Sequence, residues 1–491
     1  MGFLIGVFFI VYFRLRNFFN MIGGFLRQFS ILLLLLISIP VFAQIDTNFH
    51  YLGFDDFVDV GENWQEISKI FWGFGDYSNV EMMEEGDGVL VNIPTSEDKS
   101  HLITESTFGD IELSLDFMMA HQSNSGIYLM GRYEVQLFDS WRKIFPTYAD
   151  CGGIYQRWDD NQEFNKGYEG VPPLLNACRA PGLWQNLRIL FKAPRFDENG
   201  IKISNARFVK VYLNDILIQD EVEISGPTRS TYFKNEEAFG PLMIQGDHGR
   251  VAIRNLKYRE LEIIDTVLDR TVVDPIILRP LQEPYILRSF LNYKDEKLPY
   301  VVSVGYPNGV NYSFDTRQGS LLQVWRGDFV ETTGMWHRRG NSQVAKPLGS
   351  VVHLSDEPHL YILDNIYQPW VDKYELDYLK MEGYMLDEDR DPTFKFRLAD
   401  IEISDKINPL EDQSGLHRRI QVDSSLENLV CRLISGEIIE KINNKLYRVD
   451  DSYYIQVDDR YTIHLVEFDQ KMELRVMMQV CGGDLEYKII W

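Results

Sequence analysis

The sequence predicts an all-β protein whose strands form antiparallel sandwiches or jelly rolls. Between Ile111 and Phe117, apolar and polar residues alternate strictly, which is the period of a strand with one buried face. Short apolar runs recur along the chain and are separated by polar turns such as Asn214-Asp215. Helical periodicity is nearly absent from the same stretch. Many short strands joined by polar turns are typical of these two architectures.

The other strands of the first domain follow in chain order. Residues 133–137 alternate again and place Glu134 and Gln136 on one face of a strand. Further strands are expected at residues 126–130, 187–191, 208–213, 216–218, 242–245 and 251–256.

The N-terminal residues 1–43 predict a targeting segment. Arg27 precedes a short apolar run at residues 31–39, and small residues lead to Ala43. These are the parts of a secretory signal, so we expect cleavage after Ala43, with the true start open between Met1 and Met21. A membrane anchor is the alternative. No apolar run reaches the roughly 20 residues of a spanning helix, so we expect a secreted or periplasmic protein with no stable membrane insertion.

The charge and composition of the chain indicate which classes of binding partner are not expected. The 491 residues include 49 Lys and Arg against 73 Asp and Glu, which gives a formal net charge of -24. Such a chain repels polyanions, so nucleic acid and anionic lipid surfaces are not expected partners. An apolar share of 45% is ample for buried cores.

The length predicts two or three domains. We place the first at residues 47–262, with a boundary in the polar stretch that follows. Strand patterns continue beyond it, and a strong turn signal stands at Tyr306-Pro307-Asn308-Gly309. We expect a β-rich module at residues 275–399 and a C-terminal β-rich segment at residues 400–491.

Four cysteines are present, at Cys151, Cys178, Cys431 and Cys481. Their spacing contains no Cys-x-x-Cys, so the sequence does not support a zinc or redox motif. In an oxidising compartment they could pair as Cys151–Cys178 and Cys431–Cys481, whereas unpaired buried thiols are the equal alternative.

Two long irregular stretches interrupt the strands of the first domain, at residues 140–179 and 225–240. Loops of this length in a compact domain are usually functional or disordered. The first is too aromatic for plain disorder, since it contains Tyr148, Tyr155, Trp158 and Tyr168.

Three clusters of small and polar residues stand between Asn124 and His248. The first is Asn124-Ser125-Gly126-Ile127-Tyr128, followed by residues 133–140. The second is Gly152-Gly153-Ile154-Tyr155, with Asn176 and residues 180–184 after it. The third is Gly226-Pro227-Thr228, followed by Gly240-Pro241-Leu242 and Gln245-Gly246-Asp247-His248-Gly249.

In this order and spacing, the three clusters resemble the 3-keto-disaccharide hydrolase family, and Ala193-Pro194-Arg195-Phe196-Asp197 adds to the likeness. The resemblance covers nearly all of residues 47–262. It implies a concanavalin A-like jelly roll of two antiparallel sheets, one of which binds sugar. It also implies a secreted bacterial protein whose partner is an oligosaccharide or glycoside substrate. The resemblance assigns no activity to the β-rich region after residue 262.

The acids of the central strand do not suit an ordinary glucanase. Retaining glucanases of this fold carry Glu-x-Asp-x(-x)-Glu on one strand, and the comparable strand here has Glu134, Gln136 and Asp139. The middle position of the motif, which is an acid in those glucanases, is here the amide Gln136. Strand positions i and i+5 do not share a face, so Glu134 and Asp139 are poorly placed as the carboxylate pair that glycosidases need.

The chemistry of the family makes a different demand. A ketone at C3 acidifies the hydrogen on C2, so a base can remove that proton and expel the C1 substituent before water adds back. Such a site needs a base, an acid at the leaving oxygen and donors for the enolate oxygen. We expect Glu134, Asp247 and His248 to be the catalytic residues, with the histidine suited to base work.

Polar and aromatic residues of the same clusters are the expected substrate contacts. Asparagine, glutamine and tyrosine can hydrogen-bond sugar hydroxyls, and Trp158 or Trp141 can stack on a pyranose face. The expected set is Asn124, Gln136, Tyr155, Trp158, Asn176 and Gln245.

No metal ligand and no certain cofactor are predicted. The one candidate is a structural calcium at Asp139, because calcium favours oxygen ligands, although no clustered Asp-x-Asp loop accompanies it.

Two functions remain open from the sequence. One is a hydrolase or lyase that cleaves 3-keto-glucosides, and the alternative is a non-catalytic carbohydrate-binding protein, which a lectin-like fold permits equally. The distance between Glu134 and His248 across one pocket distinguishes the two functions, since elimination needs both groups at the same sugar.

Overall fold

The computed structural model describes residues 49–73, 80–263, 275–336, 343–375, 377–422 and 428–491. The predicted signal segment, its cleavage after Ala43 and the choice between Met1 and Met21 lie outside these residues. Within the described ranges, no helix combines the length and hydropathy needed to cross a membrane.

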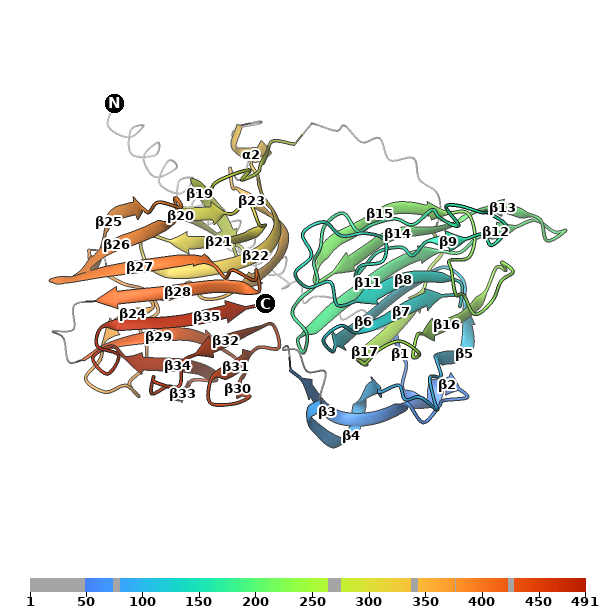
Figure 1. The fold of residues 1–491 in the computed structure, drawn as a ribbon, viewed down its shortest axis with the longest axis horizontal. Coiled ribbons are helices and arrows are strands. Elements are labelled where there is room, and N and C mark those ends of the chain that lie inside the picture. Colours follow the sequence, from blue (N-terminus) through green and yellow to red (C-terminus); the bar gives the residue numbers. More distant parts are fainter. Residues whose placement is uncertain (1–48, 74–79, 264–274, 337–342, 376, 423–427) are drawn as a thin grey trace, which may run out of the picture. The chain divides into compact units, whose positions relative to one another are not determined.

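The first domain is a sandwich of two antiparallel sheets (Figure 1). The larger sheet has eight strands, in the order β15 (Ile216–Ile224), β14 (Ala206–Leu213), β11 (Trp184–Lys192), β6 (Ile111–Met119), β17 (Val251–Glu260), β4 (Val80–Asn92) and β3 (Trp64–Trp72), with β1 (His50–Tyr51) paired to β17. The smaller sheet has the order β2 (Phe57–Val58), β5 (Leu102–Phe108), β16 (Gly240–Ile244), β7 (Asn124–Leu129) and β8 (Tyr133–Phe138).

One hydrophobic core fills the space between these two sheets. Leu113, Leu115 and Phe117 of β6 enter it from the larger sheet, and Ile127 and Val135 enter it from the smaller one. The alternation predicted at residues 111–117 therefore sets the inward face. The polar positions of β6 are also largely buried, because the strand is central and Glu112 is ion-paired with Arg259.

Short elements complete the domain. They are the 3₁₀ turn η1 (Phe54–Asp56) and the two-stranded ribbons β9 (Arg157–Trp158) with β10 (Gly167–Tyr168) and β12 (Arg195–Phe196) with β13 (Lys202–Ser204). The predicted Asn214-Asp215 turn joins β14 to β15, with φ values of 51° and 64°. Left-handed backbone at both central residues suits the twist of a two-residue hairpin, which explains why Asn and Asp occupy it.

The second half of the chain is also β-rich, and the predicted all-β fold is confirmed. A six-stranded sheet has the order β18 (Ile277–Leu278), β22 (Ser320–Glu331), β21 (Val310–Asp315), β20 (Glu296–Gly305) and β19 (Tyr285–Tyr293), with β23 (Lys346–His353) paired to β22. The short helix α2 (Thr333–Trp336) follows β22.

Two more sheets follow. One has the order β24 (Leu360–Ile362), β29 (Leu429–Gly436), β34 (Lys471–Met477) and β33 (His464–Phe468). The other has the order β25 (Leu379–Leu386), β26 (Pro392–Leu398), β27 (Ile401–Pro409), β28 (Gly415–Val422), β35 (Asp484–Ile490), β32 (Tyr453–Val457), β31 (Leu446–Val449) and β30 (Ile439–Lys441).

The boundary expected between residues 399 and 400 falls inside a hairpin. Strands β26 and β27 pair along their length, from Thr393 opposite Lys406 to Leu398 opposite Ile401. A single cluster of buried side chains also runs from residue 302 to residue 491. Residues on both sides of the expected boundary therefore share one core.

The two β regions touch through specific contacts. The indole Nε1 of Trp141 donates to the carbonyl oxygen of Trp491 at 2.5 Å, and the hydroxyl of Tyr454 donates to the carbonyl oxygen of Pro181 at 3.1 Å. Around them, one small hydrophobic cluster includes Phe71 from the first domain and Ile490 from the second half. These contacts hold Trp141, at the start of the long segment at residues 140–179, and Pro181, just after its end.

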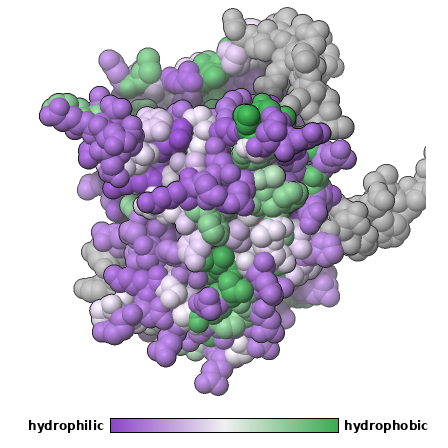
Figure 2. Space-filling view, turned by 90° about the vertical axis from the view of Figure 1, so that its right-hand side faces the viewer, coloured by the Kyte–Doolittle hydropathy of each residue, from purple (hydrophilic) through white to green (hydrophobic). Residues whose placement is uncertain are grey.

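One side of the molecular surface is shown in Figure 2. It is mainly hydrophilic, with apolar side chains gathered in a narrow band. This agrees with a solvated polar exterior for a chain with a net charge of -24.

Candidate active site

The polar residues of the first cluster lie on one face of the smaller sheet. In the β7–β8 hairpin, Tyr128 stands opposite Glu134 and Gly126 stands opposite Gln136. Directly opposed residues of an antiparallel pair point to the same face. Strand β16 joins on the other side of β7, where the amide of Gln245 donates to the carbonyl oxygen of Gly126 at 2.9 Å. We call Asn124, Tyr128, Glu134, Gln136 and Gln245 the polar face.

The opposite face of the same strands explains this orientation. Ile127, Val135 and Leu137 are fully buried in the core between the two sheets. Since successive side chains of a strand alternate, burying these residues turns Glu134 and Gln136 away from the core. The apolar positions of the hairpin thus determine which polar groups can meet.

Glu134 lies in a space that a glycine leaves free. A Cβ atom added at Gly126 would stand 2.5 Å from Oε1 of Glu134. The Glu134 residue is only 2% exposed. Burial raises the pKa of its carboxyl group to about 8, while hydrogen bonding from Tyr128 lowers it and the charge of Asp247 raises it. At neutral pH this carboxyl group is therefore protonated and can donate a proton.

Tyr155 is brought beside Glu134 by the long aromatic segment. Ile154 forms a bridge with Val135 of β8, and the amide of Tyr155 donates to the carbonyl oxygen of Glu134 at 3.2 Å. Burial and the Glu134 charge raise the pKa of Tyr155, whereas Arg229 opposes the shift. The segment at residues 140–179 thus extends the sheet and adds a phenol at the edge of the polar face.

Four oxygen atoms of the polar face are buried without a hydrogen-bond partner among the described residues. They are Oδ1 of Asn124, Oε2 of Glu134, Oε1 of Gln136 and Oε1 of Gln245. Most buried polar atoms in proteins are paired, so each such atom calls for a specific explanation. The three amide oxygens among them are acceptors, which are suited to a ligand that carries several hydroxyl donors, and the protonated carboxyl group of Glu134 adds a donor.

The third cluster forms the turn that follows β16. The Nδ1 atom of His248 lies 2.6 Å from Oδ1 of Asp247 and 3.3 Å from Nε2 of Gln245. The shorter contact is to a carboxylate, which only accepts, so it is a hydrogen bond when Nδ1 carries the proton and Nε2 is the free ring nitrogen. The His248 side chain is 53% exposed, so the imidazole ring is open to solvent.

The structure connects this turn to Glu134. Gln245 contacts His248 through its side chain and Gly126 through its backbone, and the carboxyl group of Glu134 lies over Gly126. The charge of Asp247 also acts on Glu134. Glu134, Asp247, His248, Asn124, Gln136, Gln245 and Tyr155 therefore gather in one region.

Trp158 and Asn176 are engaged elsewhere. The Arg229 guanidinium lies 3.9 Å above the ring of Trp158, so one ring face is covered. The Nδ2 atom of Asn176 donates to the carbonyl oxygens of Ser140 and Lys143, and its Oδ1 accepts from the amide of Cys178. Asn176 thus fastens the ends of the long segment together.

Three residues near the site were not anticipated from the sequence. Tyr128 stands opposite Glu134, His101 accepts a hydrogen bond from the amide of Gly246 at 3.1 Å, and Asn92 donates to the Asp247–His248 turn. Tyr128 could have been found from the hairpin register. Asn92 and His101 lie about 150 positions before the turn, so only the folded chain brings them to it.

Asp139 serves a turn. Its Oδ2 accepts from the amide of Gln122 at 2.9 Å and lies 3.2 Å from Nδ1 of His121. No group of three or more His, Cys, Asp or Glu side chains arranged to hold a metal ion occurs among the residues that the structure describes. Asp139 also ends up outside β8, apart from Glu134 in the strand.

The cysteines are thiols in this structure. Cys151 and Cys178 are both buried and interact with each other, and this contact, together with burial, raises the pKa of Cys151 well above its usual range. Cys431 is fully buried, and burial raises its pKa to about 12. Thiols with raised pKa values are poor nucleophiles, so neither Cys151 nor Cys431 is a candidate catalytic residue.

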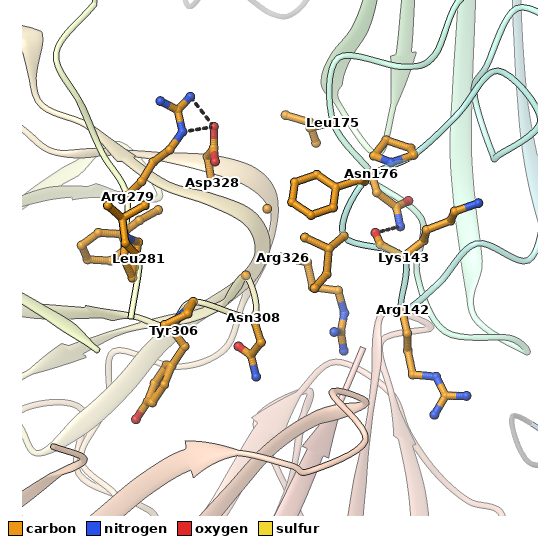
Figure 3. Close-up of a pocket in the computed structure, with 18 of the residues that line it drawn as sticks. Arg142, Lys143, Leu175, Asn176, Arg279, Leu281, Tyr306, Asn308, Arg326 and Asp328 are labelled. Atoms are coloured by element: carbon orange, nitrogen blue, oxygen red, sulfur yellow. Dashed lines mark hydrogen bonds and ion pairs between the residues drawn. The ribbon is translucent and has the colours of Figure 1, made fainter. Parts of the chain in front are cut away.

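A cavity of about 550 Å³ lies away from the polar face. Figure 3 shows its walls, with Arg142, Lys143 and Asn176 from the first domain and Tyr306, Asn308 and Asp328 from the second half. Arg279 forms an ion pair with Asp328 at 2.7 Å. None of the expected catalytic residues lines this cavity. Of the expected substrate contacts, Asn176 lines it.

Comparison with known proteins supports the assignment of the first domain. A family model described as the 3-keto-alpha-glucoside-1,2-lyase-like domain matches residues 58–263. No curated protein matches the sequence.

Three solved structures are similar to parts of the chain. Two come from Parabacteroides distasonis ATCC 8503 and are described as candidate glycosyl hydrolases. The first is 24% identical over 44% of this chain and 84% of that chain, with a TM-score of 0.30. The second is 21% identical over 40% of this chain and 99% of that chain, with a TM-score of 0.26. A carbohydrate-binding module from Bacillus subtilis is 9% identical over 40% of this chain and 96% of that chain, with a TM-score of 0.21. The predicted resemblance is confirmed: residues 58–263 match the 3-keto-alpha-glucoside-1,2-lyase-like domain family, and the strands from β18 onward lie outside the match.

Proposed function

We propose that the polar face and the Asp247–His248 turn form the active site of an enzyme that cleaves 3-keto-glucosides by elimination and hydration. The observation that carries the proposal is the presence of a candidate acid and a candidate base in one region. Glu134 is buried and protonated at neutral pH, whereas His248 is exposed and oriented by a carboxylate. An acid and a base with separate environments are what general acid–base catalysis needs.

The reaction assigns one role to each group. The Nε2 atom of His248 takes the proton from C2 of the 3-keto sugar, and Asp247 stabilises the imidazolium that forms. The C1–O bond breaks, Glu134 gives its proton to the leaving oxygen, and a C1=C2 double bond forms in conjugation with the C3 ketone. Water then adds hydroxyl to C1 and hydrogen to C2, with Glu134 as base and His248 as acid.

The amide side chains of the polar face suit the sugar itself. Asn124, Gln136 and Gln245 each keep one buried oxygen without a donor, and sugar hydroxyls supply donors. Glu134 is 2% exposed, so a sugar that reaches it displaces groups that now cover the polar face. We further propose that the protein acts outside the cytoplasm, as its N-terminal segment suggests.

The test compares matched substrates and matched variants. Purified wild-type protein, Glu134→Gln and Glu112→Gln are incubated with 3-keto-glucosides and with their unoxidised parents. Glu112 is a buried glutamate of the larger sheet that pairs with Arg259, so it controls for losing a buried acid outside the site. The proposal expects release of aglycone from the keto forms alone, retained by Glu112→Gln and reduced by about a hundredfold or more in Glu134→Gln.

Other outcomes contradict this mechanism. Cleavage of the unoxidised parents would point to an ordinary glycosidase. Saturable binding of the keto sugars without turnover would favour the alternative, a carbohydrate-binding protein.

A further inference from the structure

The turn that carries Asp247 and His248 is held at both ends by one buried side chain. The Nδ2 atom of Asn92 donates to the carbonyl oxygen of Gly246 at 2.9 Å and to that of Gly249 at 2.7 Å. Asn92 is the last residue of β4 in the larger sheet and is 0% exposed. Both amide hydrogens of the Asn92 side chain therefore bond to the two glycines that flank Asp247 and His248.

Asn92 is itself fixed from behind. Its Oδ1 accepts from Nδ2 of Asn63 at 2.7 Å, and Asn63 also donates to the carbonyl oxygen of Ser100 at 2.9 Å. The Trp64 indole donates to the same oxygen at 2.8 Å. Every hydrogen-bonding atom of the Asn92 amide has a good partner, which is the condition under which a buried polar network is rigid.

The glycines leave the turn no room to shift. A Cβ atom at Gly246 would stand 2.0 Å from the carbonyl oxygen of Ser100, and one at Gly249 would stand 2.4 Å from Oγ of Ser123. The amide of Gly246 in turn donates to Nδ1 of His101. The backbone on each side of Asp247 and His248 is thus packed directly against neighbouring strands and loops.

We infer that Asn92 is a positioning residue, which sets the orientation of the Asp247–His248 pair by clamping the carbonyl oxygens of Gly246 and Gly249. The inference rests on the proposed function for its catalytic consequence, since the clamp matters to turnover only if His248 is the base. The clamp itself is a property of the free protein. Small displacements of a catalytic group cost rate far more than they cost binding, because the reacting atoms must be aligned.

The matched control is a second clamp of the same kind. Asn311 on β21 is also 0% exposed, and its Nδ2 donates to the carbonyl oxygens of Gly309 at 3.0 Å and Gly327 at 3.2 Å. It lies in the second half of the chain, among residues with no part in the proposed reaction. Asn92→Ala and Asn311→Ala therefore remove the same chemistry from two different turns.

The experiment has one readout that needs no substrate. Imidazole signals of the nine histidines are recorded by NMR on the full chain, with His248 assigned by its loss in His248→Asn, and amide exchange is measured across residues 246–249. We expect Asn92→Ala to shift the His248 signals and speed exchange in the turn. Asn311→Ala should leave both unchanged. If Asn92→Ala does not fold, Asn92→Ser, which keeps one donor, gives a smaller shift in the same direction.

The second readout is kinetic. With a 3-keto-glucoside that the wild type turns over, Asn92→Ala should lower kcat roughly 10- to 100-fold and leave KM within about twofold, whereas Asn311→Ala should change neither. Unchanged His248 signals and turn exchange in Asn92→Ala would overturn the inference. An inactive wild type would instead overturn the proposed function, and the NMR comparison would still decide the clamp.

Discussion

Gly126 and Glu134, on neighbouring strands of one hairpin, share a single volume. The carboxyl oxygen Oε1 of Glu134 lies 2.5 Å from the point where a side chain at position 126 would begin. Any residue other than glycine at this position competes with the proposed acid for the same space. Gly126 of the Asn-Ser-Gly cluster is therefore part of the site, because its missing side chain leaves room for the Glu134 carboxyl group.

Gly126→Ala should displace the Glu134 carboxyl group and lower kcat by about tenfold or more, because the acid no longer lies where the leaving oxygen forms. Steady-state kinetics with a 3-keto-glucoside measures this loss. Gly334→Ala is the control, since a Cβ there meets nothing within 4 Å. Equal activity in the two variants would show that the position of Glu134 is unimportant.

Glu134→Gln should make the folded protein more stable at high pH. The pKa of Glu134 is raised to about 8 from an ordinary value of 4.5, so its contribution to stability is fully present below pH 4.5 and is lost as the pH rises through 8. A neutral glutamine avoids this loss.

The size of the stability gain in Glu134→Gln follows from the pKa shift of Glu134. At about 1.4 kcal/mol per pKa unit, the gain at pH 9 is on the order of a few kcal/mol, and it vanishes near pH 4. Chemical denaturation of both proteins at pH 4, 6 and 9 measures the difference in the free energy of unfolding. A difference that does not change with pH would contradict the buried, protonated acid.

The pH dependence of kcat/KM distinguishes acid from base at Glu134. An essential acid with a pKa of about 8 predicts that kcat/KM falls above that pH, because the group that protonates the leaving oxygen has lost its proton. If Glu134 acted first as the base, kcat/KM would rise through the same pH. Profiles of wild type and Glu134→Gln, measured with one 3-keto-glucoside, decide between these results.

Trp491 links the second half of the chain to the start of the aromatic segment. It is 2% exposed, and its carbonyl oxygen accepts the hydrogen bond from Trp141. Trp491→Ala should lower the free energy of unfolding by about 3–5 kcal/mol, as for other buried aromatic residues. Trp336→Ala, at a side chain that is 63% exposed, should change it little. Thermal unfolding of the two variants gives the comparison.

The polar face was predictable from sequence for a local reason. Strict alternation places Glu134 and Gln136 on one face, and the apolar residues Val135 and Leu137 settle which face is buried. Such reasoning uses neighbouring residues in a single hairpin. It needs no knowledge of the rest of the fold.

The remaining features depend on contacts between distant parts of the chain. Asn92 reaches the turn at Gly246 because β4 and β17 pair in the larger sheet, and nothing near Asn92 in the sequence indicates this. The strands on the two sides of the expected boundary at residues 399 and 400 pair in one sheet. Strand β35 lies between β28 and β32, so one sheet is built from separated segments that no local pattern could join.

The chemical order of events is the central claim, and deuterium labelling tests it most directly. The wild-type protein is incubated in D₂O with a 3-keto-glucoside, and the released sugar is examined by NMR at early times. The released sugar kept in D₂O without the protein controls for spontaneous exchange. The proton that His248 takes from C2 exchanges with D₂O while the imidazolium is open to solvent, since the side chain is 53% exposed. Elimination followed by hydration therefore predicts deuterium at C2 of the released sugar, above that control. Release of sugar with no deuterium at C2 above that control would contradict the mechanism.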